Sequence, residues 1–340
     1  LRSGREEIMQ TFARVLLASV FLVVSASAQS TAPQRHFTFH YGFTVRNVTA
    51  GQPLRIWIPL AHSDLFQDVK VISEKGDLML KHTQEHEYGD EMLYAETPKA
   101  TKTEYAFEVV YDVVRRESSQ HRIGILRATQ QKRLLSPDKL VPISGLPADL
   151  AARQVALVTG GNYAKARALY DYVLANMRYD KSGTGWGHGD TLYACNAKHG
   201  NCTDFHSLFI SMARSQKIPA RFEIGFPVPA DKHSGEIPGY HCWADFYTKD
   251  HGWVPVDISE AWKHPDQREF FFGHWDDNRI QFSVGRDVTL SPKQDGEALN
   301  YFVYPYVELN HKDHANISTH FGFEDRENAT PVNRAAVISR

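Results

Sequence analysis

Residues 200–213, GNCTDFHSLFISMA, combine the start of a helix with a cysteine placed at that start. The apolar and small residues recur at the spacing of one helix face, and they are Phe205, Leu208, Phe209, Met212 and Ala213. Asn201 is a favourable N-cap, and Asp204 follows where a carboxylate complements the helix dipole. Cys202 is therefore expected in the first turn, where the dipole and the backbone N–H groups favour its thiolate. The alternative interpretation is a small buried hydrophobic residue, which is what most unpaired cysteines are.

Two downstream strands supply a histidine and an aspartate. Residues 241–247 and 252–257 have strand composition and are joined by a polar turn. A hairpin centred on Lys249 places His241 opposite Asp257, with Cβ atoms about 4.5–5.5 Å apart. The carboxylate can then fix the imidazole tautomer, which together with Cys202 gives the nucleophile, base and orienting acid of acyl transfer. An incidental ion pair in a surface hairpin is the alternative.

His206 is a rival for the role of base. It lies one helical turn after Cys202, and its side chain leans back toward the helix N-terminus. We predict His241 instead, because no acid is evidently placed to orient His206.

Composition and charge exclude several classes of protein. The chain has 340 residues, 42% hydrophobic, and its 38 Lys and Arg against 40 Asp and Glu give a net charge of −2. No basic run offers a footprint for nucleic acid, and no apolar run is long enough for a polytopic membrane protein. Histidines and cysteines show no metal-ligand spacing, so we predict neither metal nor cofactor.

The N-terminus has the pattern of a secretory signal. Arg14 follows Met9, an apolar stretch covers residues 15–24, and a small-residue cleavage site covers 26–28. We predict a signal peptide at 1–28 with its true start at Met9, and an exported protein that is periplasmic or extracellular. No integral membrane segment is expected after its removal.

The remaining chain divides by pattern into three regions. Alternating apolar residues predict a β-rich N-terminal domain at 35–130, and a proline-rich linker follows at 136–147. A core at 150–265 begins with an amphipathic helix at 163–177. Aromatic-rich stretches after residue 266 predict a C-terminal β extension and tail to 340.

Four segments, taken in order, resemble the transglutaminase-like superfamily. They are Gly200-Asn201-Cys202-Thr203-Asp204, Ile218-Pro219-Ala220-Arg221, Gly239-Tyr240-His241-Cys242-Trp243 and Gly252-Trp253-Val254-Pro255-Val256-Asp257. The resemblance implies an α+β fold with a papain-like core, in which a helix bearing the nucleophile packs on an antiparallel sheet, here preceded by a β-sandwich-like domain. It implies a catalytic triad of Cys202, His241 and Asp257.

The predicted function is cysteine-dependent acyl transfer on a protein or peptide substrate. Cys202 attacks a peptide or carboxamide bond and forms a thioester, which water most simply hydrolyses. A cross-linking transamidase and a non-catalytic binding protein that keeps the core as a scaffold are the alternatives. The sequence does not identify the substrate.

Two further roles concern the other cysteines and the oxyanion. Strand alternation puts Cys242 on the face opposite His241, so a Cys195–Cys242 disulfide would leave Cys202 as the single free thiol of the three cysteines. Two isolated buried thiols are the alternative. The backbone N–H of Cys202 is one oxyanion donor, and the resemblance suggests Trp186, in a glycine-rich loop, as the second. Trp186 can equally serve in packing or as a wall of the substrate site.

Overall fold

The structure, a computed structural model, describes residues 33–118 and 126–326. The predicted signal peptide at 1–28 lies outside these residues. Among the residues described, no helix is both long and apolar enough to cross a membrane. Helices are concentrated in the middle of the sequence and the sheets are antiparallel, apart from one two-residue parallel pair, so the fold is α+β as predicted.

The first strand, β1 (Gln34–Val45), lies in the middle of a five-stranded antiparallel sheet. Its odd-numbered residues from Phe37 to Val45 are all buried, because alternate side chains of a strand share one face. The strands of this sheet, in spatial order, are β10 (Ser234–Glu236), β16 (Ile317–Asp325), β1, β6 (Tyr105–Arg116) and β3 (Gln67–Gly76).

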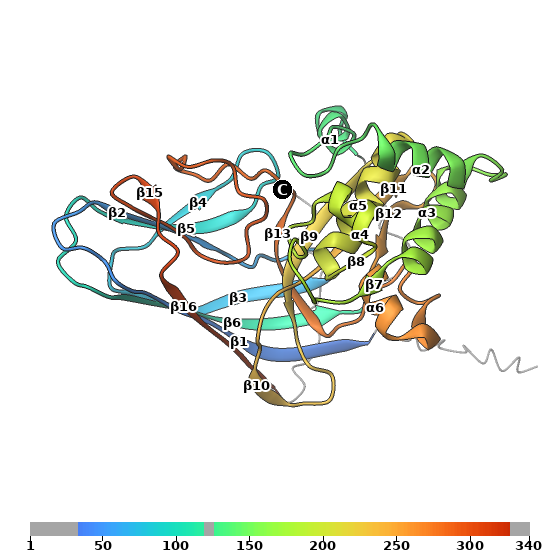
Figure 1. The fold of residues 1–340 in the computed structure, drawn as a ribbon. Coiled ribbons are helices and arrows are strands. Elements are labelled where there is room, and N and C mark those ends of the chain that lie inside the picture. Colours follow the sequence, from blue (N-terminus) through green and yellow to red (C-terminus); the bar gives the residue numbers. More distant parts are fainter. Residues whose placement is uncertain (1–32, 119–125, 327–340) are drawn as a thin grey trace, which may run out of the picture. The chain divides into compact units, whose positions relative to one another are not determined.

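A second five-stranded sheet completes the β-rich region. Its strands, in spatial order, are β15 (Lys312–Asp313), β14 (Tyr306–Leu309), β2 (Leu54–Pro59), β5 (Glu91–Thr97) and β4 (Lys81–Gln84). Apolar residues of both sheets belong to one continuous core, which gives the predicted sandwich-like arrangement. The C-terminal strands lie beside N-terminal ones in both sheets (Figure 1), so strand pairing crosses the predicted domain limits.

The third sheet is four-stranded and antiparallel. Its strands, in spatial order, are β12 (Gly252–Val256), β11 (His241–Thr248), β9 (Ala220–Pro227) and β13 (Arg279–Val284). Helix α5 (Cys202–Ser215) packs on β11 and β9. All residues of α5 from Cys202 to Arg214 are buried, because the sheet covers one side and other helices cover the rest.

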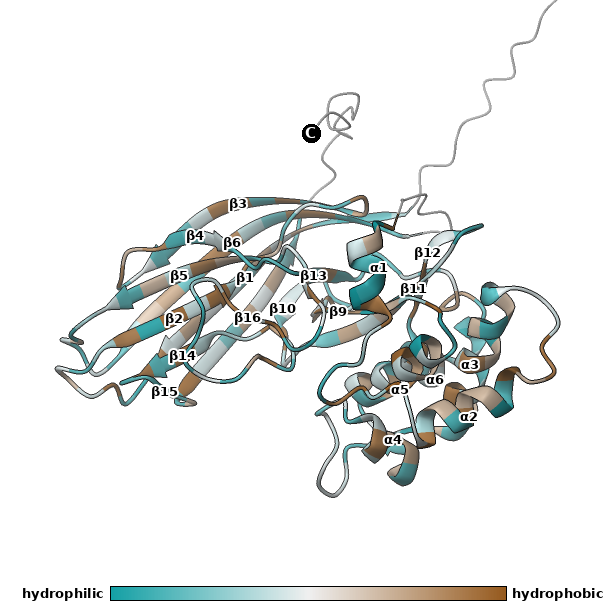
Figure 2. Ribbon diagram, turned by 90° about the horizontal axis from the view of Figure 1, so that it is seen from above, coloured by the Kyte–Doolittle hydropathy of each residue, from teal (hydrophilic) through white to brown (hydrophobic). Residues whose placement is uncertain are grey.

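Most of the remaining helices pack against α5. The remaining helices are α1 (Ala128–Leu134), α2 (Leu146–Val155), α3 (Asn162–Asn176), α4 (Thr191–Ala197), α6 (Ile258–Lys263) and the short 3₁₀-helix η1 (Pro265–Gln267). A two-residue parallel pair, β7 (Arg178–Tyr179) with β8 (His199–Gly200), precedes α5. Figure 2 shows α2 to α6 gathered beside β11 and β12.

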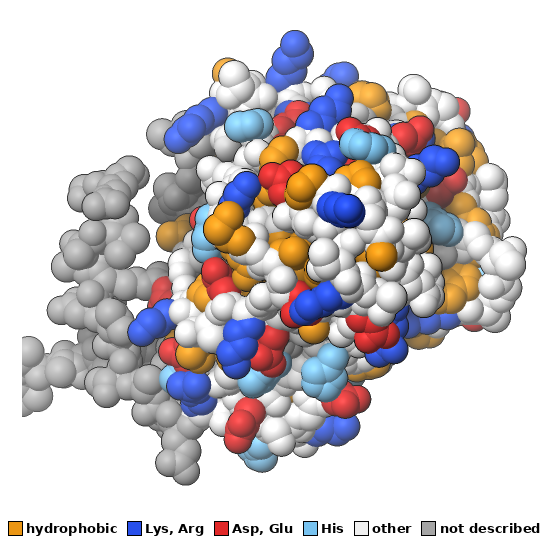
Figure 3. All heavy atoms as spheres, turned by 90° about the vertical axis from the view of Figure 1, so that its left-hand side faces the viewer, with side chains coloured by type: hydrophobic (Ala, Val, Ile, Leu, Met, Phe, Trp, Pro, Cys, Tyr) orange, Lys and Arg blue, Asp and Glu red, His pale blue; other side chains and the backbone are white. Residues whose placement is uncertain are grey.

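Charged side chains of both signs are interspersed on the face shown in Figure 3, which is the end of the β-rich region. Hydrophobic side chains on this face lie in small groups between them, and neither sign dominates an area. This face therefore shows no electrostatic footprint for a polyanion such as nucleic acid.

Candidate active site

Helix α5 begins with a capping box that fixes the position of Cys202. The Asn201 side chain accepts a hydrogen bond from the backbone N–H of Thr203 at 2.9 Å, and the Asp204 carboxylate accepts one from the N–H of Asn201 at 3.0 Å. Asp204 also accepts from Gly187 and Gly189, which ties the glycine-rich loop to the helix start. Cys202 thus occupies the first helical position, as the sequence predicts.

His241 is the first residue of β11, and Asp257 directly follows β12 as the N-cap of α6. His241 Nε2 lies 2.7 Å from Asp257 Oδ2. The other carboxylate oxygen, Oδ1, accepts from the Ser259 hydroxyl at 3.1 Å and from the Glu260 N–H at 3.1 Å. These bonds hold the Asp257 carboxylate in place. Because Nε2 of His241 faces Asp257, Nδ1 is the ring nitrogen left for the hydrogen bond with the Cys202 thiol.

The predicted hairpin register is wrong by two residues. Asp245 pairs with Pro255, whereas a centre at Lys249 would pair it with Trp253. The turn has three residues, 249–251, and Gly252 adopts a left-handed φ of 67°, which moves the centre to Asp250. His241 and Asp257 still meet, because the chain turns into α6 after Val256 and returns Asp257 toward β11.

Arg279 is a buried member of the site that sequence reasoning missed. Its Nη1 donates to Asp257 Oδ2 at 2.8 Å and its Nε to Asp276 Oδ1 at 3.2 Å. The guanidinium also lies over the Trp243 ring, 4.7 Å from its centroid. The only signal in the sequence is that Arg279 is the one charged residue of strand β13, and nothing there relates it to Asp257.

The electrostatics of the three residues favour a thiolate and an imidazolium. Burial opposes ionisation of Asp257, but His241 and Arg279 outweigh it and hold the pKa of the carboxyl well below its usual value. Burial likewise opposes the charged form of His241, but Asp257 and Cys202 raise its pKa to about 10. Burial raises the pKa of the Cys202 thiol, yet hydrogen bonds from Cys242 and His241 lower it well below its ordinary value overall.

His206 is committed to backbone groups. Its Nδ1 lies 2.8 Å from the carbonyl oxygen of Cys202, and its Nε2 accepts from the N–H of Ile258 at 3.0 Å. This pattern requires a neutral ring with the proton on Nδ1, and burial, its largest influence, lowers the pKa of His206. An acid does lie near, since Asp257 Oδ1 is 3.7 Å from Nε2, but that nitrogen already accepts a hydrogen bond. His206 therefore joins the starts of α5 and α6.

The predicted placement of Cys242 is wrong. Its sulfur lies 3.8 Å from Thr203 Oγ1 and 3.8 Å from His206 Nδ1, and its thiol is hydrogen-bonded to Cys202. Cys242 follows His241 on β11, and its side chain faces α5, which packs on this side of the sheet. Cys242 therefore lies near Cys202 even though neighbouring residues of a strand point to opposite faces.

The predicted Cys195–Cys242 disulfide is absent from the structure. Both cysteines are free and buried, with Cys195 on α4 and Cys242 against the start of α5. Burial raises the pKa of the Cys195 thiol to about 11, so this thiol is protonated near neutrality.

Trp186 does not offer a free donor. Its indole N–H donates to the Gly183 carbonyl at 3.2 Å within the same loop. Tyr240, for which the motifs suggested no role, contacts both chain neighbours of Cys202: its hydroxyl accepts from Asn201 Nδ2 at 3.0 Å and lies 2.9 Å from Thr203 Oγ1. Tyr240 thereby ties the start of β11 to the start of α5.

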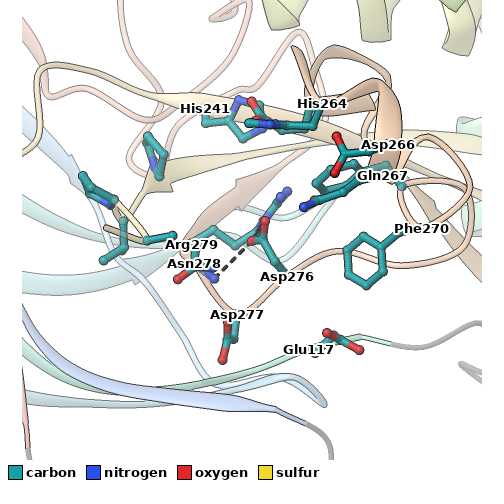
Figure 4. A pocket seen from close by; sticks show the side chains of 16 residues that line it. Glu117, His241, His264, Asp266, Gln267, Phe270, Asp276, Asp277, Asn278 and Arg279 are labelled. Carbon is teal, nitrogen blue, oxygen red and sulfur yellow. Dashed lines mark hydrogen bonds and ion pairs between the residues drawn. The ribbon is translucent and has the colours of Figure 1, made fainter. Parts of the chain in front are cut away.

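A cavity of about 710 Å³ opens onto His241 (Figure 4). His264, Asp266 and Gln267 lie on the same side as His241, whereas residues 276–279 and Glu117 lie on the opposite side. Its volume lies within the range typical of ligand sites. The cavity gives a substrate room beside the imidazole.

One set of side chains has the composition of a metal site. Single ligand atoms of His241, Asp257 and Glu260 lie within 4.8 Å of one another. Asp257 Oδ2, however, already binds both His241 and the Arg279 guanidinium, and Glu260 Oε1 binds Lys263 at 2.6 Å. These residues fit a hydrogen-bonded charge network better than a cation site.

Comparison with known proteins gives a family for this region. The family model of the transglutaminase-like superfamily matches residues 149–258. A Haemophilus influenzae protein of uncharacterised function is 27% identical over 315 residues, which cover 80% of this chain and 85% of the relative.

One solved structure shows a similar fold over most of the chain. A protein from Cytophaga hutchinsonii, described as an inferred cysteine protease, superposes with a TM-score of 0.59 at 14% identity, covering 88% of this chain and 94% of its own. The periplasmic domain of TgpA from Pseudomonas aeruginosa is more distant, with a TM-score of 0.38 at 16% identity over 69% of this chain and 90% of its own.

Proposed function

On the premise that residues 149–258 form a transglutaminase-like superfamily domain, we propose that this protein is an exported cysteine-dependent acyl-transfer enzyme. Cys202 is the nucleophile, His241 the base and acid, and Asp257 the residue that orients His241. Most simply, the enzyme hydrolyses peptide or carboxamide bonds. The signal pattern at residues 9–28 supports export.

One observation carries this proposal: the hydrogen-bonded series from Cys202 through His241 to Asp257. Asp257 lies 2.7 Å from His241, and the imidazole in turn contacts the thiol at the start of α5. A low thiol pKa beside a high imidazole pKa keeps the nucleophile ionised at neutral pH, while the proton stays on the ring.

The reaction follows from these proton positions. The Cys202 thiolate forms a bond to the amide carbon, and the backbone N–H of Cys202 stabilises the resulting oxyanion. The His241 imidazolium gives its proton to the leaving nitrogen as the C–N bond breaks, which leaves a thioester and releases an amine. Neutral His241 then takes a proton from water as the water oxygen attacks the thioester, and cleavage of the C–S bond restores thiolate and imidazolium.

The test combines labelling with turnover. Iodoacetamide at pH 7 is expected to modify Cys202 in preference to Cys195 and Cys242, as read by peptide mapping. A panel of peptide amides should lose amine or release a carboxylate, and Cys202→Ala should abolish this turnover. Cys195→Ala is the matched control, because Cys195 lies on α4 outside the site, and it should keep full activity.

The outcomes separate the alternatives. If the enzyme incorporates a biotinylated amine faster than it releases carboxylate, its main reaction is transamidation and not hydrolysis. Labelling of Cys202 without turnover on any peptide would favour a binding protein. Equal labelling of all three cysteines, or no labelling below pH 9, would reject Cys202 as the nucleophile.

A further inference from the structure

Carboxylates dominate the charged lining of the cavity beside His241. Glu117 follows β6, Glu260 belongs to α6, Asp266 to η1, and Asp276 and Asp277 precede β13. We call the cavity lined by these five residues the acidic cavity. Segments far apart in the sequence supply these charges, so only the fold brings them together.

Part of this negative charge has a neighbouring cation. Arg279 binds Asp276, and Lys263 binds Glu260 at 2.6 Å, while His264 lies 3.7 Å from Glu260. Arg279 itself is shared with Asp257. Arg279, Lys263 and His264 therefore already have carboxylate partners.

The other three carboxylates of the acidic cavity form no ion pair with a described residue. Among the described residues, Glu117, Asp266 and Asp277 take part in no ion pair. Burial raises the pKa of Glu117, and repulsion by Asp277 and Asp276 raises it further. Burial and the neighbouring Asp276 likewise raise the pKa of Asp277, although Arg35 and Arg115 partly oppose them. Like charges held this close are relieved by a cationic ligand.

The cavity is also tied to the reacting groups, which distinguishes it from a cluster of acids on a surface. His241 lines it although the imidazole side chain is only 7% exposed, and Arg279 lines it from beside Asp257. His241 is also hydrogen-bonded to Cys202, so a group that flanks an amide held at these two residues has the cavity beside it. Carboxylate-lined clefts with low-dielectric walls concentrate cations.

We propose that the acidic cavity selects substrates with a positively charged group, a lysine or arginine side chain, beside the amide that Cys202 attacks. This inference rests on the proposed function and names its substrate class. Glu117 and Asp277 act as specificity determinants, because their charge has no ion-pair partner among the described residues.

The test maps the charge preference with methanethiosulfonate reagents that share one leaving group and carry a trimethylammonium, a neutral methyl or a sulfonate group. Second-order rates at Cys202, read by peptide mapping, are divided by the rates with N-acetylcysteine. The cationic reagent should exceed the anionic one by about tenfold or more at low salt. The preference should shrink as salt rises to about 0.5 M, because the Debye length shortens.

Variants locate the preference. Glu117→Gln with Asp277→Asn should lower the cation-to-anion ratio to about threefold or less, while the normalised rate of the neutral reagent stays within about twofold. The matched control is Asp250→Asn, in the exposed turn between β11 and β12, which should keep the wild-type ratio. Peptide amides with lysine, norleucine or glutamate beside the amide should then rank in that order of kcat/KM.

Two failures are distinguishable. A reactive Cys202 with a ratio near one in the wild-type protein overturns the charge selection and leaves the proposed function intact. A thiol inert to all three reagents overturns the proposed function and the inference with it. If the double variant does not fold, a wild-type ratio that does not change with salt still refutes the proposal.

Discussion

Asp257→Asn tests the electrostatic coupling on which the proposed nucleophile depends. The substitution keeps the shape of the side chain but removes the charge that faces His241 Nε2 at 2.7 Å. Asp257 is the strongest influence that raises the pKa of His241 from 6.5 to about 10. At 1.36 kcal/mol per unit, this difference corresponds to roughly 5 kcal/mol of preference for the imidazolium.

Loss of most of that preference leaves His241 neutral at pH 7. The Cys202 thiolate then loses its cationic partner, and its pKa should return to about 8.5 or above. At pH 7 only about 3% of such a thiol is ionised, so alkylation should slow by roughly 30-fold. The measurement is the iodoacetamide rate at Cys202 from pH 5 to pH 10. The wild-type rate should be nearly constant through neutrality, whereas the variant rate should climb with pH.

The control removes a different buried carboxylate. Asp138 accepts from Arg214 at 2.7 Å and does not contact His241, so Asp138→Asn should leave the labelling profile unchanged. Asp257→Asn also leaves Arg279 with one fewer partner and should cost about 3–5 kcal/mol of folding stability. Circular dichroism must therefore confirm folding at the labelling temperature. A folded Asp257→Asn protein that is alkylated at pH 7 within twofold of wild type would refute the reasoning.

Three further outcomes are expected. His241→Ala should remove nearly all turnover. His206→Ala should change the labelling of Cys202 little, but it should lower the free energy of unfolding by about 1–3 kcal/mol because the Ile258 N–H loses its acceptor. Loss of labelling in His206→Ala alone would reverse the two assignments. Arg279→Lys should lower kcat more than it raises KM, because one ammonium cannot reproduce the forked contacts; an unchanged kcat would assign Arg279 to folding alone. The pH profile of acylation should rise as Cys202 loses its proton below neutrality and fall as the pair loses the His241 proton near pH 10, and a profile that instead rises through pH 9 would contradict a preformed ion pair.

The sequence by itself determined the local elements that carry the proposed triad. The capping box at Asn201 and Asp204 sets where α5 begins, and it needs only residues within one turn. Alternation predicted the buried face of β1, and strand composition predicted β11 and β12. The motifs around Cys202, His241 and Asp257 indicated the family, which the match over residues 149–258 confirmed.

Only the tertiary structure decided which side chains meet. Register depends on the turn, and a three-residue turn with a left-handed Gly252 moved it by two residues. Cys242 lies at the site because α5 packs on the face of β11 that Cys242 occupies, whereas alternation alone had predicted that this face points away from the site. Both Cys195 and Cys242 are free in the structure, so the predicted disulfide is not formed there. Contacts such as Arg279 with Asp257, and the lining of the acidic cavity, join residues far apart in the chain. Local patterns fix φ, ψ and the period of a segment, but they contain no information on what packs against it, so long-range charge networks appear only when the chain is folded.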